Sequence, residues 1–239
     1  MGNVVRQFTV TLTTKEPFRI GALQNALSGL DNPVATVGGR VVVQGSSLKG
    51  ALRAEIERYL IEKYGSDDLM KPCIPSAANT LSPEEQALIN KKIYRPDGGC
   101  VYSMRRKSDS ICPACYLLGA QGLPGFVRVP YLFTEAPAED LYSVRVDRAT
   151  GVVAERTNRD YQIMPDGTVF TGALEVLTND VGRGWALGTK RFNEDKWVGS
   201  GKWDADKILE EFVVARLQEI TLMGGFKSKG CGKVAILVS

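Results

Sequence analysis

The stretch that decides the fold is Gly45–Arg53, which reads Gly-Ser-Ser-Leu-Lys-Gly-Ala-Leu-Arg. Its Gly-Ser-Ser opening predicts the start of a helix, with Ser46 or Ser47 capping the first turn. Apolar residues then recur at helical spacing and predict one buried face: Leu48, Ala51, Leu52, Ile56, Tyr59 and Leu60. Lys49 and Arg53 lie on another face, close to the positive end of the helix dipole. This arrangement suits an anion such as a phosphate, and an amphipathic helix with a solvated basic edge is the alternative.

The overall composition sets outer limits. With 239 residues and 44% hydrophobic content, the chain can bury one core, or one core with a smaller satellite. Its 30 basic and 27 acidic residues give a net charge of +3, so any case for nucleic acid depends on how the cations are distributed. The sequence has no long apolar run and no signal-peptide pattern. We therefore expect a cytoplasmic protein without a membrane partner.

Histidine is absent from the chain. This excludes a histidine general base, a Ser-His or Cys-His nucleophile pair, and a histidine metal ligand. Any catalysis has to use carboxylates, lysine, tyrosine, serine, cysteine, a bound metal ion or the substrate itself.

The predicted elements alternate between strands and helices. The strands are expected at Val4–Thr13, Arg40–Gln44, Phe126–Phe133, Leu141–Val146 and Val234–Val238, with a hairpin formed by Tyr161–Met164 and Thr168–Leu177. Besides the helix that starts at Gly45, a second long helix is expected over Ala205–Leu222, capped by Asp204. Residues 19–39 form a long connection that contains Asp31 in a turn signal. This order predicts an α+β sandwich of the ferredoxin-like kind and one domain over residues 1–239.

Four of the five cysteines lie in a segment of different composition, about residues 65–125, which we interpret as an insertion with one short helix, Ser82–Lys92. These are Cys73, Cys100, Cys112 and Cys115, the last two in a Cys-Pro-Ala-Cys knuckle. Without histidine, they predict a structural Zn²⁺ bound by four thiolates, with no open position for chemistry. Unpaired buried cysteines, disulfides and a redox Cys-x-x-Cys are the alternatives. Cys231 lies apart and is expected to be a packed residue.

A second cationic stretch, Met223–Val234, combines four glycines with three lysines. Glycines let the backbone approach a ligand closely, and Lys227, Lys229 and Lys233 add positive charge. The alternative is a flexible surface loop between a helix and a strand. Phe226 is suited to stack on a base, or else to anchor the loop in the core.

Five motifs in order carry a resemblance to a known family. They are Arg19-Ile20-Gly21, the turn Gly29–Val34, Gly45-Ser46-Ser47-Leu48-Lys49-Gly50, the stretch Val144–Gly151, and the glycine-rich Gly224–Gly232. Together they resemble the RAMP-superfamily backbone subunit of type III CRISPR effector complexes, over most of the chain. The stretch Gly182–Trp203, with Trp185, Trp197 and Trp203, has no clear counterpart in that family.

The resemblance implies an RRM-like core that stacks into a filament on a CRISPR RNA and cuts the paired target RNA. Its partners would be CRISPR RNA, single-stranded target RNA, other copies or paralogues of itself and further effector subunits. Asp31 matches the family's catalytic aspartate, and residues from about 147 to 164 match a hairpin thumb that crosses the guide–target duplex. A zinc-binding insertion also occurs in relatives. The residues expected to bind RNA are Ser47, Lys49, Arg53, Arg148, Gly225, Phe226, Lys227, Lys229 and Lys233.

The chemistry expected of Asp31 follows from its acidity. An aspartate with a pKa of about 3.9 is a poor proton acceptor at neutral pH, but its ionised oxygens are good ligands for Mg²⁺. We therefore expect Asp31 to position a divalent ion or the scissile phosphate while the neighbouring RNA 2′-hydroxyl attacks. The rivals are an RNA-binding subunit that does not cut and a zinc-stabilised adaptor that binds protein through its tryptophans. A guide-processing ribonuclease is disfavoured because many such enzymes use histidine.

Overall fold

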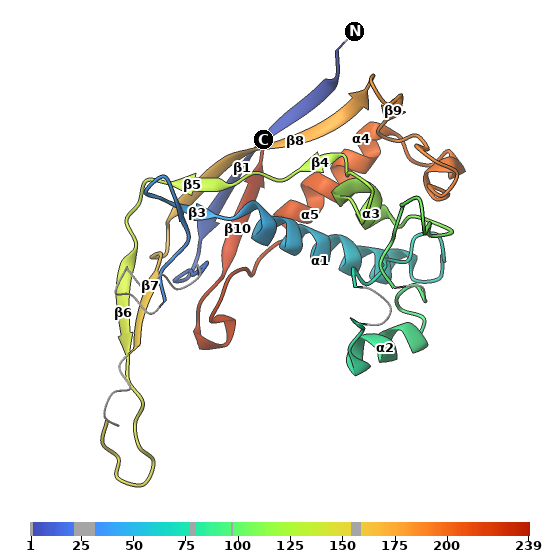
Figure 1. The fold of residues 1–239 in the computed structure, drawn as a ribbon. Coiled ribbons are helices and arrows are strands. Elements are labelled where there is room, and N and C mark those ends of the chain that lie inside the picture. Colours follow the sequence, from blue (N-terminus) through green and yellow to red (C-terminus); the bar gives the residue numbers. More distant parts are fainter. Residues whose placement is uncertain (1, 22–31, 77–79, 97, 154–158) are drawn as a thin grey trace. The chain divides into compact units, whose positions relative to one another are not determined.

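A computed structural model describes the chain except for residues 1, 22–31, 77–79, 97 and 154–158 (Figure 1). It divides into two compact units. The helical unit comprises Met1–Phe8, Lys49–Val129 and Leu174–Glu219, and the strand unit comprises Thr9–Leu48, Pro130–Ala173 and Ile220–Ser239. Three elements contribute residues to both units: β1 (Val4–Thr14), α1 (Gly45–Tyr64) and β8 (Val169–Asp180). The expected single domain therefore stays a prediction, and each unit is described by itself.

The strand unit is built on an antiparallel sheet in which strands distant in sequence are neighbours. Its strands follow the order β10-β1-β8-β5-β3-β2, where β10 is Val234–Val238, β5 is Leu132–Thr134, β3 is Arg40–Val43 and β2 is Thr36–Val37. The pairing of Val10 with Val238 and of Thr14 with Val234 sets the register of the two terminal strands. In β1, Val10, Leu12 and Thr14 are buried and alternate with more exposed residues, as expected for a sheet with one covered face.

A separate two-stranded sheet lies in the same unit, where β6 (Glu139–Ser143) pairs with β7 (Arg159–Ile163). The predicted hairpin between Tyr161–Met164 and Thr168–Leu177 is therefore wrong. Thr14 explains the difference, because its hydroxyl donates to the carbonyl of Pro165 and accepts from the amide of Thr168, both at 2.8 Å. These bonds turn the chain toward β1 instead of back onto β7. The predicted thumb, about 147–164, overlaps the second half of the β6/β7 hairpin, and its role stays a prediction.

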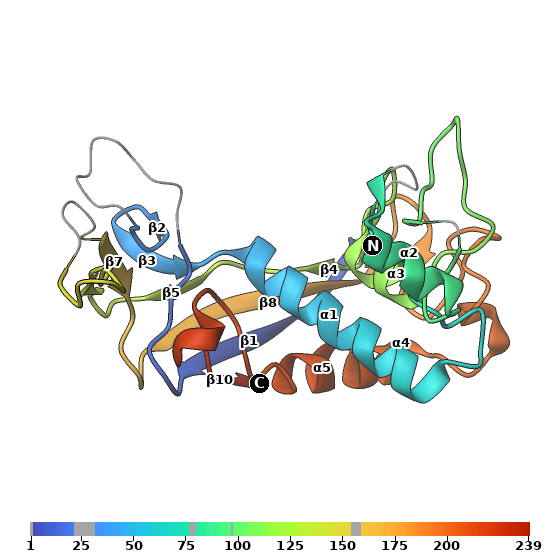
Figure 2. The same ribbon diagram turned by 90° about the horizontal axis from the view of Figure 1, so that it is seen from below.

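The helical unit packs α1 against the helical segment near the end of the chain (Figure 2). That segment consists of α4 (Ala205–Ile208), a π-helical stretch (Leu209–Val214) and α5 (Ala215–Gln218), where the sequence predicted one continuous helix. Leu52, Ile56 and Leu60 of α1 are fully buried, and the ring of Tyr59 contacts Phe212 at 5.9 Å between centroids. The other elements of this unit are α2 (Pro83–Asn90), α3 (Pro113–Leu118), β4 (Val127–Arg128), β9 (Trp185–Ala186) and a 3₁₀ turn (Val198–Ser200).

One of the two predicted helix caps is confirmed, and the expected helix at Ser82 is capped as well. Asp204 accepts a hydrogen bond from the amide of Lys207, and Ser82 forms a reciprocal capping box with Glu85. At α1, however, the helix begins at Gly45, and the carbonyl of Gln44 already accepts from the amides of Ser47 and Leu48. Ser46 and Ser47 therefore lie inside the first turn and do not cap it.

The tryptophan-rich stretch packs into the helical unit. Trp197 is 1% exposed and Trp203 is 7% exposed, and their rings meet at 5.7 Å. Arg191 and Asp195 form a fully buried ion pair at 3.1 Å, and the Arg191 guanidinium lies 4.3 Å from the ring centre of Tyr116. Two of the three tryptophans are thus core residues.

The helices and the antiparallel sheet together confirm the predicted α+β class, and the cysteine-bearing segment about 65–125 falls within the Lys49–Val129 portion of the helical unit. None of the described helices combines the length and hydrophobicity that crossing a lipid bilayer requires.

Candidate functional site

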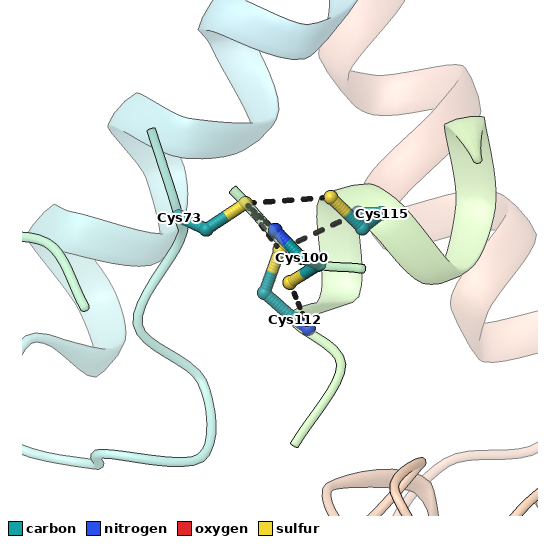
Figure 3. Close-up of side chains that lie close together, drawn as sticks. All are labelled: Cys73, Cys100, Cys112 and Cys115. Atoms are coloured by element: carbon teal, nitrogen blue, oxygen red, sulfur yellow. Dashed lines mark hydrogen bonds between the residues drawn. The ribbon is translucent and has the colours of Figure 1, made fainter. Parts of the chain in front are cut away.

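Four cysteine thiols converge inside the helical unit (Figure 3). Cys73 and Cys100 come from loops on either side of α2, while Cys112 and Cys115 stand at the start of α3. All four side chains are buried, and their sulfur atoms lie within 4.8 Å of one another. The Sγ of Cys73 is 3.4 Å from that of Cys115 and 3.7 Å from that of Cys112. Cys231, in the strand unit, is buried and does not belong to this cluster.

The spacing of these sulfurs fits a tetrahedral zinc ion. Zn–S bonds of 2.3 Å in a tetrahedron place the sulfurs about 3.8 Å apart, which lies within the range of this cluster. Backbone amides are also aimed at the sulfurs, since the N–H groups of Cys100, Cys112 and Cys115 each approach a neighbouring Sγ at 3.4 Å. Such N–H donors favour the ionised thiolates that metal binding requires.

The hydrogen bonds among the thiols change their acidity in opposite directions. Those with Cys100, Cys115 and Cys73 lower the pKa of Cys112 well below its usual range, whereas the bond with Cys112 raises the pKa of Cys100 and the bond with Cys100 raises that of Cys115. Four soft thiolates are a donor set typical of zinc and leave no position for a substrate. The residues present therefore fit a structural zinc, which would stabilise the loops around α2 and α3 and supply no reaction chemistry.

Arg53, which was predicted to bind RNA, points its guanidinium at this cluster. Its Nη2 lies 3.4 Å from the Sγ of Cys73 and 3.6 Å from that of Cys115, and its Nη1 lies 3.6 Å from the latter. Its Nε forms an ion pair with Glu57 at 2.6 Å, and both side chains are about 15% exposed (15% and 14%). Burial works against the charge of Arg53, but the thiols and the carboxylate outweigh it and raise the guanidinium pKa. Burial also raises the pKa of Glu57 to about 7, against the effect of Arg53.

A second buried arginine stands beside the cluster. Arg95 is 9% exposed, and its guanidinium donates to three backbone carbonyls: Lys71 at 2.7 Å, Ser110 at 2.7 Å and Leu69 at 2.5 Å. The Ser110 carbonyl also faces the Sγ of Cys100 at 4.0 Å. Arg95 thereby holds together the loops that carry the thiols, a role that the sequence analysis did not predict.

In the strand unit, the glycine-rich stretch lies against the segment after β1. Gly224 has a φ of 83°, and a Cβ atom there would come within 2.4 Å of the Arg19 carbonyl oxygen. The amide of Gly225 donates to the same oxygen at 2.8 Å. A larger residue at position 224 would push the loop away from Arg19, so this glycine is required for the close approach.

Phe226 stands at the centre of a cationic cluster in this unit, in which Lys229 is exposed, Arg19 and Phe226 are half-buried and Tyr161 is buried. The Arg19 guanidinium lies 5.0 Å from its ring centre, the Lys229 ammonium 4.9 Å, and the ring of Tyr161 meets it edge-on at 5.0 Å. Phe226 itself adopts a left-handed backbone conformation with a φ of 60°. The Nε of Arg19 is buried and has no hydrogen-bond partner among the described residues. We call Arg19, Tyr161, Phe226 and Lys229 the Phe226 cluster.

Asp31 lies outside the described residues, but the residue after it is held firmly. The carbonyl of Asn32 accepts from the amide of Gln162 at 3.0 Å, and its side-chain amide donates to the carbonyl of Asp160 at 3.3 Å. The side chain of Gln162 in turn approaches the amide of Val34 at 3.3 Å. Strand β7 therefore anchors the end of the long connection that carries Asp31.

The remaining predicted RNA-binding residues differ in surroundings. Lys49, Lys227 and Arg148 are exposed, and Ser47 is half-buried in the first turn of α1. Arg148 lies in a turn held by the Asp147 carboxylate, which accepts from the amides of Ala149 and Thr150. Lys233 forms an ion pair with Glu16 at 2.6 Å, so part of its charge is already balanced. Lys49 and Arg53 belong to the helical unit, and the other predicted RNA-binding residues belong to the strand unit.

The structure also identifies functional candidates that the sequence analysis missed. Arg19 was quoted there as part of a motif but was given no role, and Tyr161 was assigned only to a strand. The sequence shows a cation directly before Ile20-Gly21. It does not show that this segment packs against the glycine-rich loop more than 200 residues later, which is what brings Arg19 to Phe226. That packing is tertiary information.

Comparison with known families decides the relationship. The family model of the RAMP superfamily matches residues 11–235, which is nearly the whole chain. The chain belongs to the RAMP superfamily. A search of curated proteins gave no significant match. Membership confirms the resemblance at the level of the superfamily and supports the ferredoxin-like fold of this RAMP protein. It points to a CRISPR-associated, RNA-binding role.

Proposed function

We propose that this RAMP protein is a CRISPR RNA-binding backbone subunit of a type III effector complex that cleaves guide-paired target RNA. The observation that carries the proposal is the superfamily match over residues 11–235, together with a cationic aromatic cluster on the loop expected to contact RNA. Its partners in this role are CRISPR RNA, target RNA, other copies or paralogues of the subunit and further effector subunits.

The Phe226 cluster has the composition of a single-strand RNA contact. Arg19 and Lys229 place two cations at 5.0 Å and 4.9 Å from the ring centre of Phe226. Cations contact phosphates without reading sequence, and aromatic rings stack on bases of any identity. Such a surface suits a protein whose target is chosen by guide pairing.

Cleavage is assigned to Asp31 and the RNA itself. The ribose 2′-oxygen attacks the adjacent phosphorus, the bond to the 5′-oxygen breaks, and a cyclic 2′,3′-phosphate and a 5′-hydroxyl end result. The 2′-hydroxyl loses its proton to solvent and the departing 5′-oxygen gains one. Asp31 would hold a divalent ion such as Mg²⁺, which supplies charge stabilisation at the phosphate when bound. The anchoring of Asn32 on β7 supports a fixed position for the segment that follows Asp31.

The adaptor alternative has less support. It required the tryptophans as a protein-binding surface, whereas Trp197 and Trp203 are core residues and Trp185 is half-buried. A subunit that binds RNA without cutting it remains as the other outcome of the test below.

The proposal is tested by target-RNA cleavage with the assembled complex. We expect Asp31→Asn to abolish cleavage while guide and target binding stay unchanged, and EDTA to stop cleavage by the wild type. The matched control is Asp166→Asn, because Asp166 is an exposed aspartate of the Pro165–Gly167 turn. Wild-type cleavage by the Asp31→Asn complex would overturn the catalytic assignment. No cleavage by the wild type in the presence of Mg²⁺ would identify the non-cutting subunit.

A further inference from the structure

We infer that Arg53 is a positioning residue of the metal centre, with its guanidinium hydrogen-bonded to the sulfurs of Cys73 and Cys115 and balancing the charge of the thiolates. The sequence assigned this arginine to RNA. The inference rests on the cysteine cluster and does not depend on the proposed RNA function.

The geometry is that of a fork spanning two ligands. Nη2 reaches both the Sγ of Cys73 at 3.4 Å and the Sγ of Cys115 at 3.6 Å, and Nη1 adds a second contact with Cys115 at 3.6 Å. These two sulfurs are also only 3.4 Å apart. The planar guanidinium is suited to bridging two acceptors held so close, whereas the ammonium group of a lysine acts as a point charge.

The negative charge of a zinc–thiolate centre explains why arginines would lie beside it. Zinc bound by four thiolates carries a formal charge of −2, and a buried charge is costly unless opposite charges lie beside it. Arg53 and Arg95 bring two buried cations to this region, and Arg95 has only carbonyl partners among the hydrogen bonds of the described residues. Glu57 offsets part of the charge of Arg53. Beside four neutral thiols, Arg53 would rely on Glu57 for its counter-charge and Arg95 on backbone carbonyls, so the two arginines favour a loaded, dianionic centre.

The position of Arg53 on α1 gives the contact a structural consequence. Arg53 lies on the same helix as Leu52 and Ile56, which are fully buried, so its backbone is fixed by the core of the helical unit. The guanidinium also donates to the Cys73 carbonyl at 3.3 Å. The metal centre is thereby tied to α1, one turn beyond the exposed Lys49. Zinc binding is expected to hold this part of the helix in place.

The test measures zinc retention by the purified full-length chain. We expect Arg53→Gln to weaken zinc affinity about 10- to 100-fold in competition with a chromogenic chelator, as is typical when a group hydrogen-bonded to a metal ligand is lost. The Co²⁺-substituted variant should show shifted thiolate-to-metal charge-transfer bands, a change that mere destabilisation elsewhere would not cause. Arg53→Lys should lie between the wild type and Arg53→Gln, because it restores charge without the fork. The matched control is Arg58→Gln, on the same helix, where Arg58 pairs with Glu55 and is 49% exposed.

The outcomes separate the two roles of Arg53. Wild-type zinc affinity and an unchanged Co²⁺ spectrum in Arg53→Gln would overturn the inference, and a selective loss of RNA binding in that variant would restore the RNA assignment. If Arg53→Gln cannot be purified in folded form, Arg53→Lys decides alone. Zinc release several-fold faster than in the wild type supports the fork, and release at the wild-type rate overturns it.

Discussion

Nη2 of Arg53 donates to Cys73 twice, to its Sγ at 3.4 Å and to its carbonyl oxygen at 3.3 Å. One arginine of α1 thus fixes both the thiol and the backbone of the first cysteine in the cluster. The loop that carries Cys73 has little regular structure of its own, so this link and the metal together define its position. Substitution of any of the four cysteines is therefore expected to lower the stability of the whole helical unit.

Cys112→Ser should remove zinc and destabilise the protein. Cys112 is fully buried and also caps α3, so its loss removes a ligand together with the order around it. We expect elemental analysis to show no stoichiometric zinc and the melting temperature to fall by at least about 5 °C, which corresponds to roughly 2 kcal/mol for a chain of this size. Cys231→Ser makes the same chemical change at a buried cysteine outside the cluster and should retain zinc. Full zinc content in Cys112→Ser would contradict the site.

Glu211 is predicted to make the stability of the helical unit depend on pH. Its carboxylate accepts hydrogen bonds from Lys63 at 2.7 Å, from Tyr64 at 2.9 Å and from Tyr59. Burial alone would raise its pKa, but these donors outweigh burial and lower it. A lowered folded-state pKa means that the stabilisation is present above the unfolded pKa of about 4.3 and is lost as the pH falls through the lower folded value.

Glu211→Gln should therefore cost about 1–2 kcal/mol at pH 7 and lower the melting temperature by about 2–8 °C. The difference from the wild type should shrink as the pH falls below about 4.3 and then through the lower folded-state pKa, below which Glu211 is protonated in both states. Thermal melts between pH 3 and 8 measure this. Glu210→Gln, at the exposed neighbouring position, is the control. A difference that stays constant down to pH 3 would rule out the charged hydrogen bonds as its source.

Arg19→Ala should weaken RNA binding and reduce its salt dependence. A cation that contacts one phosphate of a single strand contributes about 0.7 to the log–log slope, and losing it lowers affinity for all sequences alike. Arg40→Ala is a close control, since Arg40 also lies over a phenylalanine, Phe133 at 4.7 Å, but is paired with Glu135 at 2.6 Å. Equal effects of the two substitutions would show that Arg19 has no special place in RNA binding.

Phe226→Gly separates backbone strain from ring contacts. A non-glycine residue with a φ of 60° costs roughly 1–2 kcal/mol, which glycine would relieve, so the loss of ring packing should be partly offset in stability. RNA affinity should nevertheless fall by about 1–3 kcal/mol, with the salt slope unchanged, because stacking is not ionic. Fluorescence anisotropy and a thermal melt of the same variant measure both. A large drop in melting temperature with unaltered RNA affinity would show that Phe226 only anchors the loop.

Much of the fold could be predicted because it depends on residues that are close together in the sequence. The apolar spacing of α1, the alternation of β1 and the Asp204 and Ser82 caps each depend on neighbours a few residues away. The cysteine cluster was predictable because four of the five cysteines fall in one segment of a chain without histidine, a pattern typical of thiolate metal ligands. These features needed no knowledge of distant contacts.

The errors lie where distant segments decide. The pairing of β7 with β6 instead of β8 depends on Thr14, which precedes its partner Pro165 by 151 residues in the chain. Arg53 has the spacing of a phosphate-binding residue on its helix, and only the fold reveals that thiols occupy its guanidinium. The contacts of Arg19 with Gly224 and Phe226 likewise appear only when the glycine-rich loop packs on it.

The salt dependence of RNA binding tests the central claim most directly. Binding of a labelled single-stranded guide RNA to the purified full-length chain would be measured from about 50 to about 300 mM salt, because phosphate contacts weaken strongly over this range. A subunit that contacts three or more phosphates should give a log–log slope of about −2 or steeper. A flat response, or no binding at low salt, would contradict the assignment of this RAMP protein as an RNA-binding subunit.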